Sequence, residues 1–207
     1  MSQIYLISPP SFDLKTFLPR LESVLKTGLV PVFQLRLKDY AKSEIIKISH
    51  EIKKICAQNN CLFILNDHLE IALEVGADGV HLGDEDGSIF EARKKSPQNF
   101  IIGSSCYNSR HLAMEAGEQG ANYIAFGAFF ETKTKVTKAK AEPEILEWAS
   151  EILNLPIVAI GGIDDKNSKQ LTKAGADFVA VISYVWNHPL GEVIAIKSLH
   201  EAISQKE

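Results

Sequence analysis

Eight short apolar runs, separated by longer segments with helical spacing, constrain the fold of this sequence most strongly. The runs are rich in Val, Ile, Leu and Phe without strict apolar–polar alternation, which is typical of parallel strands covered on both faces. We expect strands at Ile4–Ser8, Val32–Leu37, Leu62–Asn66, Gly79–Gly83, Ile101–Ser105, Tyr123–Gly127, Ile157–Gly161 and Phe178–Ser183. We expect helices at Leu14–Lys26, Lys42–Gln58, Leu69–Val75, Ile89–Lys95, Ser109–Gln119, Pro143–Leu153, Ser168–Lys173 and Leu190–Ser204.

Strict alternation of eight strands with eight helices predicts an α/β fold of the (β/α)8 TIM-barrel type. A doubly wound sheet is the alternative, because alternation alone does not show that the sheet closes. A chain of 207 residues can bury a large core as one unit, and no linker-like or low-complexity segment divides it. We therefore expect residues 1–207 to form a single barrel domain.

A weak internal repeat marks three of the expected helix-to-strand turns. The repeated segments are Gly76-Ala77-Asp78, Gly120-Ala121-Asn122 and Gly175-Ala176-Asp177. The glycine suits the left-handed position that ends a helix, and the Asp or Asn suits a tight turn into the next strand. These turns belong to the face of a barrel that serves stability, so the repeat predicts structure rather than function.

Composition excludes several classes of function. The net charge of −4 gives no general attraction for nucleic acid or an anionic membrane, and no apolar run approaches the ~20 residues that span a bilayer. The N-terminus lacks the basic flank of a signal peptide. The three cysteines, Cys56, Cys61 and Cys106, are an odd number without CxxC spacing, so they indicate neither a disulfide framework nor a zinc site. We expect a cytoplasmic protein that binds neither nucleic acid nor membrane.

Polar residues follow the carboxyl ends of the expected strands, which meet at one face of a barrel. Gln34, Arg36 and Lys38 are spaced by two and therefore lie on one side of the chain. Other strands lead into Asn66 and Asp67, Asp84 to Asp86, Ser104 and Ser105, Thr132, Thr134 and Lys135, Gly161 and Gly162, and Ile182 and Ser183. The sequence thus gathers cations, carboxylates and hydroxyls at one end of the sheet.

These residue types favour a phosphorylated ligand with a metal ion. Arg36 and Lys38 inside a barrel mouth need anionic partners, and Asp67 and Asp86 offer the oxygen ligands that Mg²⁺ prefers when it bridges phosphates. An equally weighted interpretation is that these four residues simply form ion pairs with one another. His81, within an expected strand, is interpreted as a hydrogen-bonded core histidine rather than a base. No arrangement of Ser, Cys and His suggests a covalent nucleophile.

An ordered set of motifs resembles the thiamine phosphate synthase family. The motifs are Gln34-x-Arg36-x-Lys38, Asn66-Asp67, Gly79-Val80-His81-Leu82-Gly83-x-x-Asp86, Ile102-Gly103-x-Ser105, Gly127-x-x-Phe130-x-Thr132-x-Thr134-Lys135, Ala159-Ile160-Gly161-Gly162-Ile163 and Val181-Ile182-Ser183. Each motif is weak alone, but the set covers expected strands two to eight in the family's order and is highly specific.

The resemblance implies a (β/α)8 transferase that joins hydroxymethylpyrimidine diphosphate to thiazole phosphate, or its carboxylated precursor, giving thiamine phosphate and diphosphate. It implies that Mg²⁺ is bound by Asp67 and Asp86. The residues that it assigns to the pyrimidine diphosphate are Gln34, Arg36, Lys38, Asn66, Ser105 and Lys135, of which Arg36, Lys38, Ser105 and Lys135 would act on the departing diphosphate. The residues that it assigns to the thiazole phosphate are Thr132, Thr134, Gly162, Ile182 and Ser183.

The sequence also departs from the family's pattern. Asp84 occupies a position usually held by Gln, and Tyr107 stands where a His is common. A thiazole tautomerase-like paralogue is disfavoured, because the diphosphate-binding set is complete and the His at position 107 is absent. A non-catalytic barrel that binds thiamine phosphates is disfavoured by the paired Asp67 and Asp86. The oligomeric state is left open, with a homodimer as one option.

Overall fold

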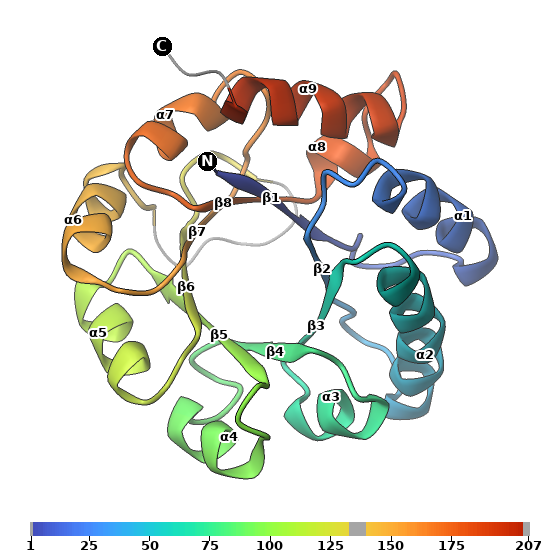
Figure 1. The fold of residues 1–207 in the computed structure, drawn as a ribbon, viewed down its shortest axis with the longest axis horizontal. Coiled ribbons are helices and arrows are strands. Elements are labelled where there is room, and N and C mark those ends of the chain that lie inside the picture. Colours follow the sequence, from blue (N-terminus) through green and yellow to red (C-terminus); the bar gives the residue numbers. More distant parts are fainter. Residues whose placement is uncertain (1, 133–139, 205–207) are drawn as a thin grey trace.

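Eight parallel strands close into a barrel in the computed structural model, which describes residues 2–132 and 140–204. Each strand pairs with the next along the chain, and β8 pairs with β1 to close the sheet (Figure 1). The strands are β1 (Gln3–Ile7), β2 (Val32–Leu35), β3 (Leu62–Asn66), β4 (Gly79–Leu82), β5 (Ile101–Tyr107), β6 (Tyr123–Gly127), β7 (Ile157–Ile160) and β8 (Phe178–Val181). The (β/α)8 barrel is confirmed, and the closure rules out the doubly wound sheet.

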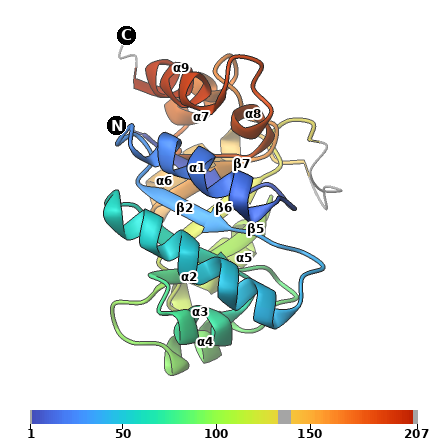
Figure 2. The same ribbon diagram turned by 90° about the vertical axis from the view of Figure 1, so that its right-hand side faces the viewer.

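Helices surround the barrel and connect successive strands (Figures 1 and 2). They are α1 (Leu14–Leu25), α2 (Lys42–Gln58), α3 (Leu69–Val75), α4 (Ile89–Lys95), α5 (Arg110–Glu118), α6 (Glu144–Ile152), α7 (Ser168–Lys173), α8 (Ser183–Trp186) and α9 (Glu192–Ser204). Eight of these match expected helices, whereas the short α8 was not expected. None of the helices in the described part of the chain has the length and apolar character needed to cross a bilayer.

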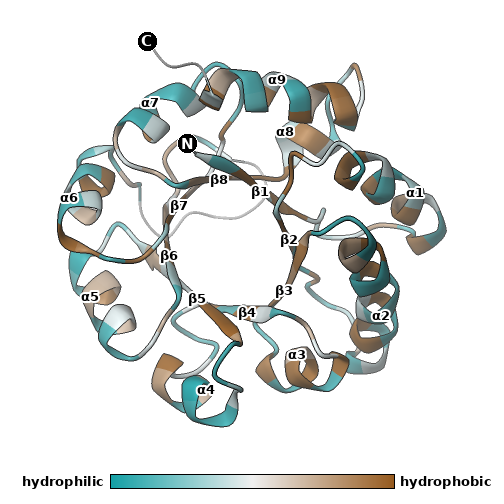
Figure 3. Ribbon diagram, in the orientation of Figure 1, coloured by the Kyte–Doolittle hydropathy of each residue, from teal (hydrophilic) through white to brown (hydrophobic). Residues whose placement is uncertain are grey.

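Side chains of each strand alternate between the barrel interior and the layer beneath the helices. In β1, Tyr5 and Ile7 point inward, whereas Ile4 and Leu6 pack toward the helices. The inner cluster comprises Tyr5, Ile7, Val32, Ile64, Tyr123, Ala125, Val158 and Ala180. Figure 3 shows hydrophobic residues along the strands and hydrophilic residues on the outer side of helices such as α2. Burial on both faces explains why the strands read as continuous apolar runs.

The repeated turns adopt the conformation that the sequence predicts. The φ angles of Gly76, Gly120 and Gly175 are 63°, 97° and 110°. The side chains of Asp78, Asn122 and Asp177 accept hydrogen bonds from the backbone N–H groups of Phe63, Ile102 and Ile157 at 2.7, 2.8 and 2.9 Å. Each repeat therefore ends a helix in the left-handed region and fixes the start of an adjacent strand.

The strand ends differ from the predicted ends at β8, where the expected strand continued to Ser183. The backbone N–H groups of Val185 and Trp186 both donate to Ile182 O at 3.1 Å, so the chain turns into helix α8. The indole Nε1 of Trp186 also donates to Ile7 O at 2.7 Å, and its ring packs near Phe17. Burial of Trp186 against the neighbouring strand thus favours a helical turn over a longer strand.

Candidate active site

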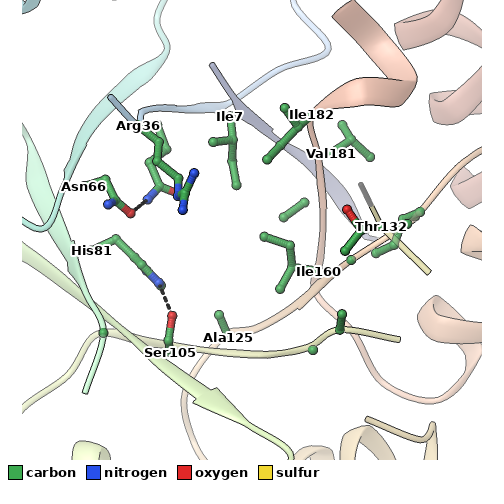
Figure 4. A pocket seen from close by; sticks show the side chains of 18 of the residues that line it. Ile7, Arg36, Asn66, His81, Ser105, Ala125, Thr132, Ile160, Val181 and Ile182 are labelled. Atoms are coloured by element: carbon green, nitrogen blue, oxygen red, sulfur yellow. Dashed lines mark hydrogen bonds between the residues drawn. The ribbon is translucent and has the colours of Figure 1, made fainter. Parts of the chain in front are cut away.

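A cavity of about 530 Å³ opens at the carboxyl ends of the strands. Every expected site residue that the structure describes borders it. These residues are Gln34, Arg36, Lys38, Asn66, Asp67, Asp86, Ser105, Thr132, Gly162, Ile182 and Ser183. Thr134 and Lys135 lie outside the described residues. The structure therefore brings together, from the ends of seven strands (β2 to β8), side chains that are far apart in the sequence (Figure 4).

The end of β2 places its polar residues at the cavity by simple alternation. Gln34, Arg36 and Lys38 border the cavity, whereas Leu35 and Leu37 belong to the hydrophobic core. The sequence predicted that this strand would end at Leu37, whereas β2 ends at Leu35. The alternation of side chains continues beyond that end. Gln34 is 3% exposed.

A hydrogen bond between two buried amides joins the ends of β2 and β3. The Nε2 group of Gln34 donates to Asn66 Oδ1 at 2.6 Å, and both side chains are buried (Figure 4). Because each amide then has fixed orientation, the remaining donors of Asn66 and acceptor of Gln34 are held in place at the cavity wall.

Asp67 and Asp86 lie next to each other at the mouth. Burial, followed by the hydrogen bond to Asp86 and its charge, raises the pKa of Asp67 to about 6, against the opposing charges of Lys38 and Arg36. The Oδ2 atom of Asp86 also accepts a hydrogen bond from the Gly83 N–H at 2.9 Å. Among residues 2–132 and 140–204, no ion pair joins Arg36 or Lys38 to either carboxylate. The close ion pairs that the internal-pairing interpretation requires are therefore not formed among these described residues, although the charges of Lys38 and Arg36 still act on Asp67.

The donor set at Asp67 and Asp86 fits a magnesium ion. Two adjoining carboxylates repel each other when both are ionised, and a divalent cation would offset that repulsion. Within the described residues no cluster of three or more His, Cys, Asp or Glu side chains could hold a metal ion. Mg²⁺ commonly takes only one or two protein carboxylates and completes its shell with waters and substrate phosphates.

His81 links the cavity to the barrel interior. Its Nε2 atom lies 2.8 Å from Ser105 Oγ (Figure 4), and its Nδ1 atom lies 2.9 Å from the Tyr123 hydroxyl. The prediction of a buried, hydrogen-bonded histidine is confirmed, since His81 is 9% exposed. Its position on the cavity wall was missed. The alternation of Gly79, His81 and Gly83 with outward-facing Val80 and Leu82 could have revealed it.

An apolar wall faces the polar one across the cavity. It is formed by Ile7, Ala125, Ile160, Val181 and Ile182. Figure 4 shows Ile160, Val181 and Ile182 across the cavity from Arg36, Asn66 and His81. Sequence reasoning identified only Ile182 of this group, because apolar residues at strand ends are indistinguishable from core. A cavity with one charged and one apolar wall can hold a ligand that combines a ring with an anionic group.

Two residues that depart from the pattern of the resembled family, Asp84 and Tyr107, contact each other. The Tyr107 hydroxyl donates to Asp84 Oδ1 at 2.5 Å, and both residues border the cavity. Tyr107 follows an irregularity in the pairing of β5 with β6 and has a φ of 54°, a region that bulky residues seldom occupy. Asp67 likewise has a positive φ, 66°. Such conformations often gather at functional sites.

Comparison with known proteins places this site within a family. A family model described as thiamine monophosphate synthase matches residues 4–185. A thiamine-phosphate synthase of Rhodospirillum centenum is 45% identical over 201 residues, which cover 97% of each chain. One from Pelagibacter ubique is 43% identical over 185 residues, which cover 89% of each chain.

Solved structures agree with the sequence comparisons. A thiamine phosphate pyrophosphorylase from Pyrococcus furiosus superimposes with a TM-score of 0.84 at 32% identity, covering 97% of this chain and 95% of that chain. A 3-hexulose-6-phosphate synthase superimposes with a TM-score of 0.70 at only 16% identity, a likeness that concerns the fold alone. With its barrel, its ordered motifs and these relatives, the chain belongs to the thiamine monophosphate synthase family.

Proposed function

We propose that this protein is a thiamine phosphate synthase that joins 4-amino-2-methyl-5-hydroxymethylpyrimidine diphosphate to a thiazole phosphate. The products are thiamine phosphate and diphosphate. One observation supports this most strongly: a single cavity combines the cations Arg36 and Lys38 with the carboxylates Asp67 and Asp86 on one side and an apolar wall on the other. The polar side suits a metal-bound diphosphate, and the apolar side suits aromatic rings.

The cations act on the leaving group. Arg36 and Lys38 neutralise negative charge that grows on the diphosphate as its bond to the pyrimidine methylene breaks, so their effect is largest in the transition state. Asp67 and Asp86 would hold a Mg²⁺ ion, which supplies further positive charge to the diphosphate oxygens. Gln34 and Asn66, already ordered by their mutual hydrogen bond, offer neutral polar contacts to the same substrate.

The reaction is a dissociative substitution. The carbon–oxygen bond breaks with both electrons leaving on the diphosphate, and the thiazole nitrogen donates its lone pair to form the new carbon–nitrogen bond. No strong base is needed, because neither step removes a proton. The apolar residues Ile7, Ala125 and Ile160 border the cavity and would keep water away from the cationic methylene.

The thiazole phosphate would bind near the ends of β7 and β8. Loops after strands seven and eight, together with a short extra helix, commonly form the phosphate site of such barrels, and α8 is such a helix. Gly162 has a φ of 63°, and a Cβ atom there would lie 2.4 Å from Glu131 O. Only glycine therefore fits, because the loop after β6 packs closely against it. Gly162 borders the cavity together with Thr132, Ile182 and Ser183.

A coupling assay tests this function. Purified protein is incubated with both substrates, with and without Mg²⁺, and thiamine phosphate is measured by its mass. We expect product only when both substrates and Mg²⁺ are present. Conversion of a thiazole precursor alone, without pyrimidine diphosphate, would instead identify a tautomerase. Absence of any turnover despite tight binding of thiamine phosphate would contradict the proposal and indicate a binding protein.

A further inference from the structure

We propose that a buried chain of hydrogen bonds holds His81 in one neutral tautomer, with its proton on Nε2, and thereby directs the Ser105 hydroxyl proton into the cavity. His81 is in this view a positioning residue that acts through Ser105. The inference rests on the proposed function in one respect only, namely that the acceptor of the Ser105 proton is an oxygen of the diphosphate substrate.

The chain runs from the interior of the barrel to the cavity. The Tyr5 and Tyr123 hydroxyl oxygens are 2.8 Å apart, the Tyr123 hydroxyl is 2.9 Å from His81 Nδ1, and His81 Nε2 is 2.8 Å from Ser105 Oγ. Tyr5, Tyr123 and His81 are 3%, 7% and 9% exposed. Three of the four members are therefore shielded from solvent, and each link has the length of a normal hydrogen bond.

The order of donors and acceptors along the hydrogen bonds follows from the hydroxyl proton of Tyr5, at the inner end. Among the residues that the structure describes, Tyr123 is the one hydrogen-bond partner of the Tyr5 hydroxyl. A buried hydroxyl proton without an acceptor is costly, so Tyr5 donates to Tyr123. Tyr123 must then donate its own proton to His81 Nδ1. A neutral imidazole that accepts at Nδ1 has its proton on Nε2.

Both tyrosines keep their protons, as this direction requires. Burial, and then the neighbouring Tyr123, raises the pKa of Tyr5 well above its usual value. Burial also raises the pKa of Tyr123. Each phenol is therefore neutral across the range in which a biosynthetic enzyme works, and the order of donors does not change with pH there.

The sequence makes room for this arrangement at Gly103. A Cβ atom on Gly103 would lie 1.9 Å from Cζ of Tyr123, so the tyrosine ring occupies the space of the absent side chain. Gly103 is paired with His81 in the β4–β5 register, and the Tyr123 and His81 rings lie nearly parallel with centroids 5.5 Å apart. The absence of a side chain at Gly103 thus allows the Tyr123 hydroxyl to reach Nδ1 of His81.

The tautomer decides what Ser105 offers to a ligand. When Nε2–H donates to Ser105 Oγ, the hydroxyl proton of Ser105 needs another acceptor, and the cavity is where one would bind. With the other tautomer, Ser105 would donate to His81 and present only lone pairs to the cavity. Diphosphate oxygens accept hydrogen bonds and do not donate them, so only the first arrangement favours the substrate.

Nitrogen chemical shifts of the imidazole rings test the tautomer directly in the unmodified protein. A long-range ¹H–¹⁵N spectrum of the full chain is recorded without ligand and with Mg²⁺ and inorganic diphosphate. The His81 signals are assigned by their loss in His81→Gln. We expect a protonated Nε2 and an unprotonated Nδ1. A proton on Nδ1, or an even mixture of tautomers, would overturn the inference.

Two matched tyrosine variants test the origin of the tautomer. Tyr123→Phe removes the donor to Nδ1, so His81 should populate both neutral forms. Tyr5→Phe removes a similar buried hydroxyl, and with it the alternative acceptor that the described residues offer to the Tyr123 proton, so the Nε2–H form should persist. An unchanged His81 signal in Tyr123→Phe would show that Tyr123 does not set the tautomer.

Two substitutions at His81 test the effect on the ligand. His81→Gln keeps an N–H donor near the position of Nε2, whereas His81→Met has similar length and no polar hydrogen. Calorimetry with Mg²⁺ and inorganic diphosphate should show binding on the order of tenfold weaker in His81→Met than in His81→Gln. Equal affinities in the two variants would overturn the inference.

The same variants separate this inference from the proposed function. If the protein couples the substrates, KM for the pyrimidine diphosphate should differ between His81→Met and His81→Gln, while KM for the thiazole phosphate should match. If the protein does not couple the substrates, the proposed function fails. The tautomer and the diphosphate affinities then still confirm or contradict the role of His81.

Discussion

The Tyr107 hydroxyl donates a hydrogen bond of 2.5 Å to Asp84 Oδ1, beside the carboxylates Asp67 and Asp86. Asp84 and Tyr107 are two of the positions at which the sequence departs from the resembled pattern, which has Gln and His there. A carboxylate in place of an amide adds negative charge near Asp67 and Asp86. The phenol that replaces the histidine supplies a donor to that carboxylate, so we expect the two departures to compensate each other.

A double-mutant cycle tests this compensation. Tyr107→Phe removes the donor to Asp84, so more negative charge faces the diphosphate and KM for the pyrimidine diphosphate should rise. In an Asp84→Gln background the same change should have a smaller effect. We expect a coupling free energy of about 0.5–1.5 kcal/mol, because the contact is exposed. Equal effects in the two backgrounds would show that the residues act independently.

Magnesium should stabilise the protein more at neutral than at acidic pH. The pKa of Asp67 is raised from 3.8 to about 6, first by burial and then by Asp86. Because the pKa of Asp67 is higher in the folded than in the unfolded protein, protonation of Asp67 stabilises the metal-free fold at acidic pH. This stabilisation is lost as the pH rises through about 6. Below that pH, Mg²⁺ must displace a proton from Asp67.

Thermal unfolding with and without Mg²⁺ provides the measurement. The gain in melting temperature on adding Mg²⁺ should be larger at about pH 7.5 than at about pH 5. In Asp67→Asn the gain should be small at both values, because asparagine lacks the negative charge that attracts Mg²⁺ and does not titrate in this range. A gain in wild-type protein that does not change between these two pH values would contradict the assignment of Asp67.

The buried amide pair should contribute to stability as well as to binding. Gln34→Leu leaves Asn66 Oδ1 without its 2.6 Å donor in a buried position. We expect the free energy of unfolding to fall by about 1–3 kcal/mol, as measured by urea denaturation. Gln3→Leu, the same change at an exposed position of β1, is the matched control and should stay within about 0.5 kcal/mol of wild type. Equal losses would argue against a specific role for the amide contact.

The helix-to-strand turns should affect stability without affecting activity. Asp78→Ala removes the carboxylate that accepts the Phe63 N–H at 2.7 Å, on the barrel face opposite the cavity. The free energy of unfolding should fall by about 1–2 kcal/mol, with kcat and KM unchanged at moderate temperature. Asp78→Asn keeps an acceptor and should lose less. A fall in kcat in folded Asp78→Ala protein would show that this turn influences the active site.

Much of the fold follows from the sequence because its signals are local. Gly76 ends a helix in the left-handed region, and Asp78 caps the neighbouring strand, as the residue types predict. The strand at Val32 was recognised from its apolar run, but its end at Leu35 was not. Just beyond that end the Arg36 N–H donates at 2.9 Å to Oγ of Ser8, which follows β1, a contact with a distant part of the sequence that no local pattern specifies.

The polar residues of the site could be predicted from the sequence, whereas its apolar residues could not. Arg36 and Asp67 stand out because charges at strand ends seldom serve a core. Ile7 and Ile160 border the same cavity, but their residue types are equally suited to packing. The links between His81, Tyr123 and Tyr5 join three different strands and depend on the register of the barrel, which no local pattern specifies.

We expect the transfer to be magnesium-assisted and to depend on Asp67. The most direct test is the rate of thiamine phosphate formation across a range of Mg²⁺ concentrations, in wild-type protein and in Asp67→Asn. Wild-type protein should turn over in proportion to bound Mg²⁺ and release one diphosphate per product, whereas folded Asp67→Asn should lose at least about a hundredfold in kcat. Turnover by Asp67→Asn at the wild-type rate under limiting Mg²⁺ would contradict the account.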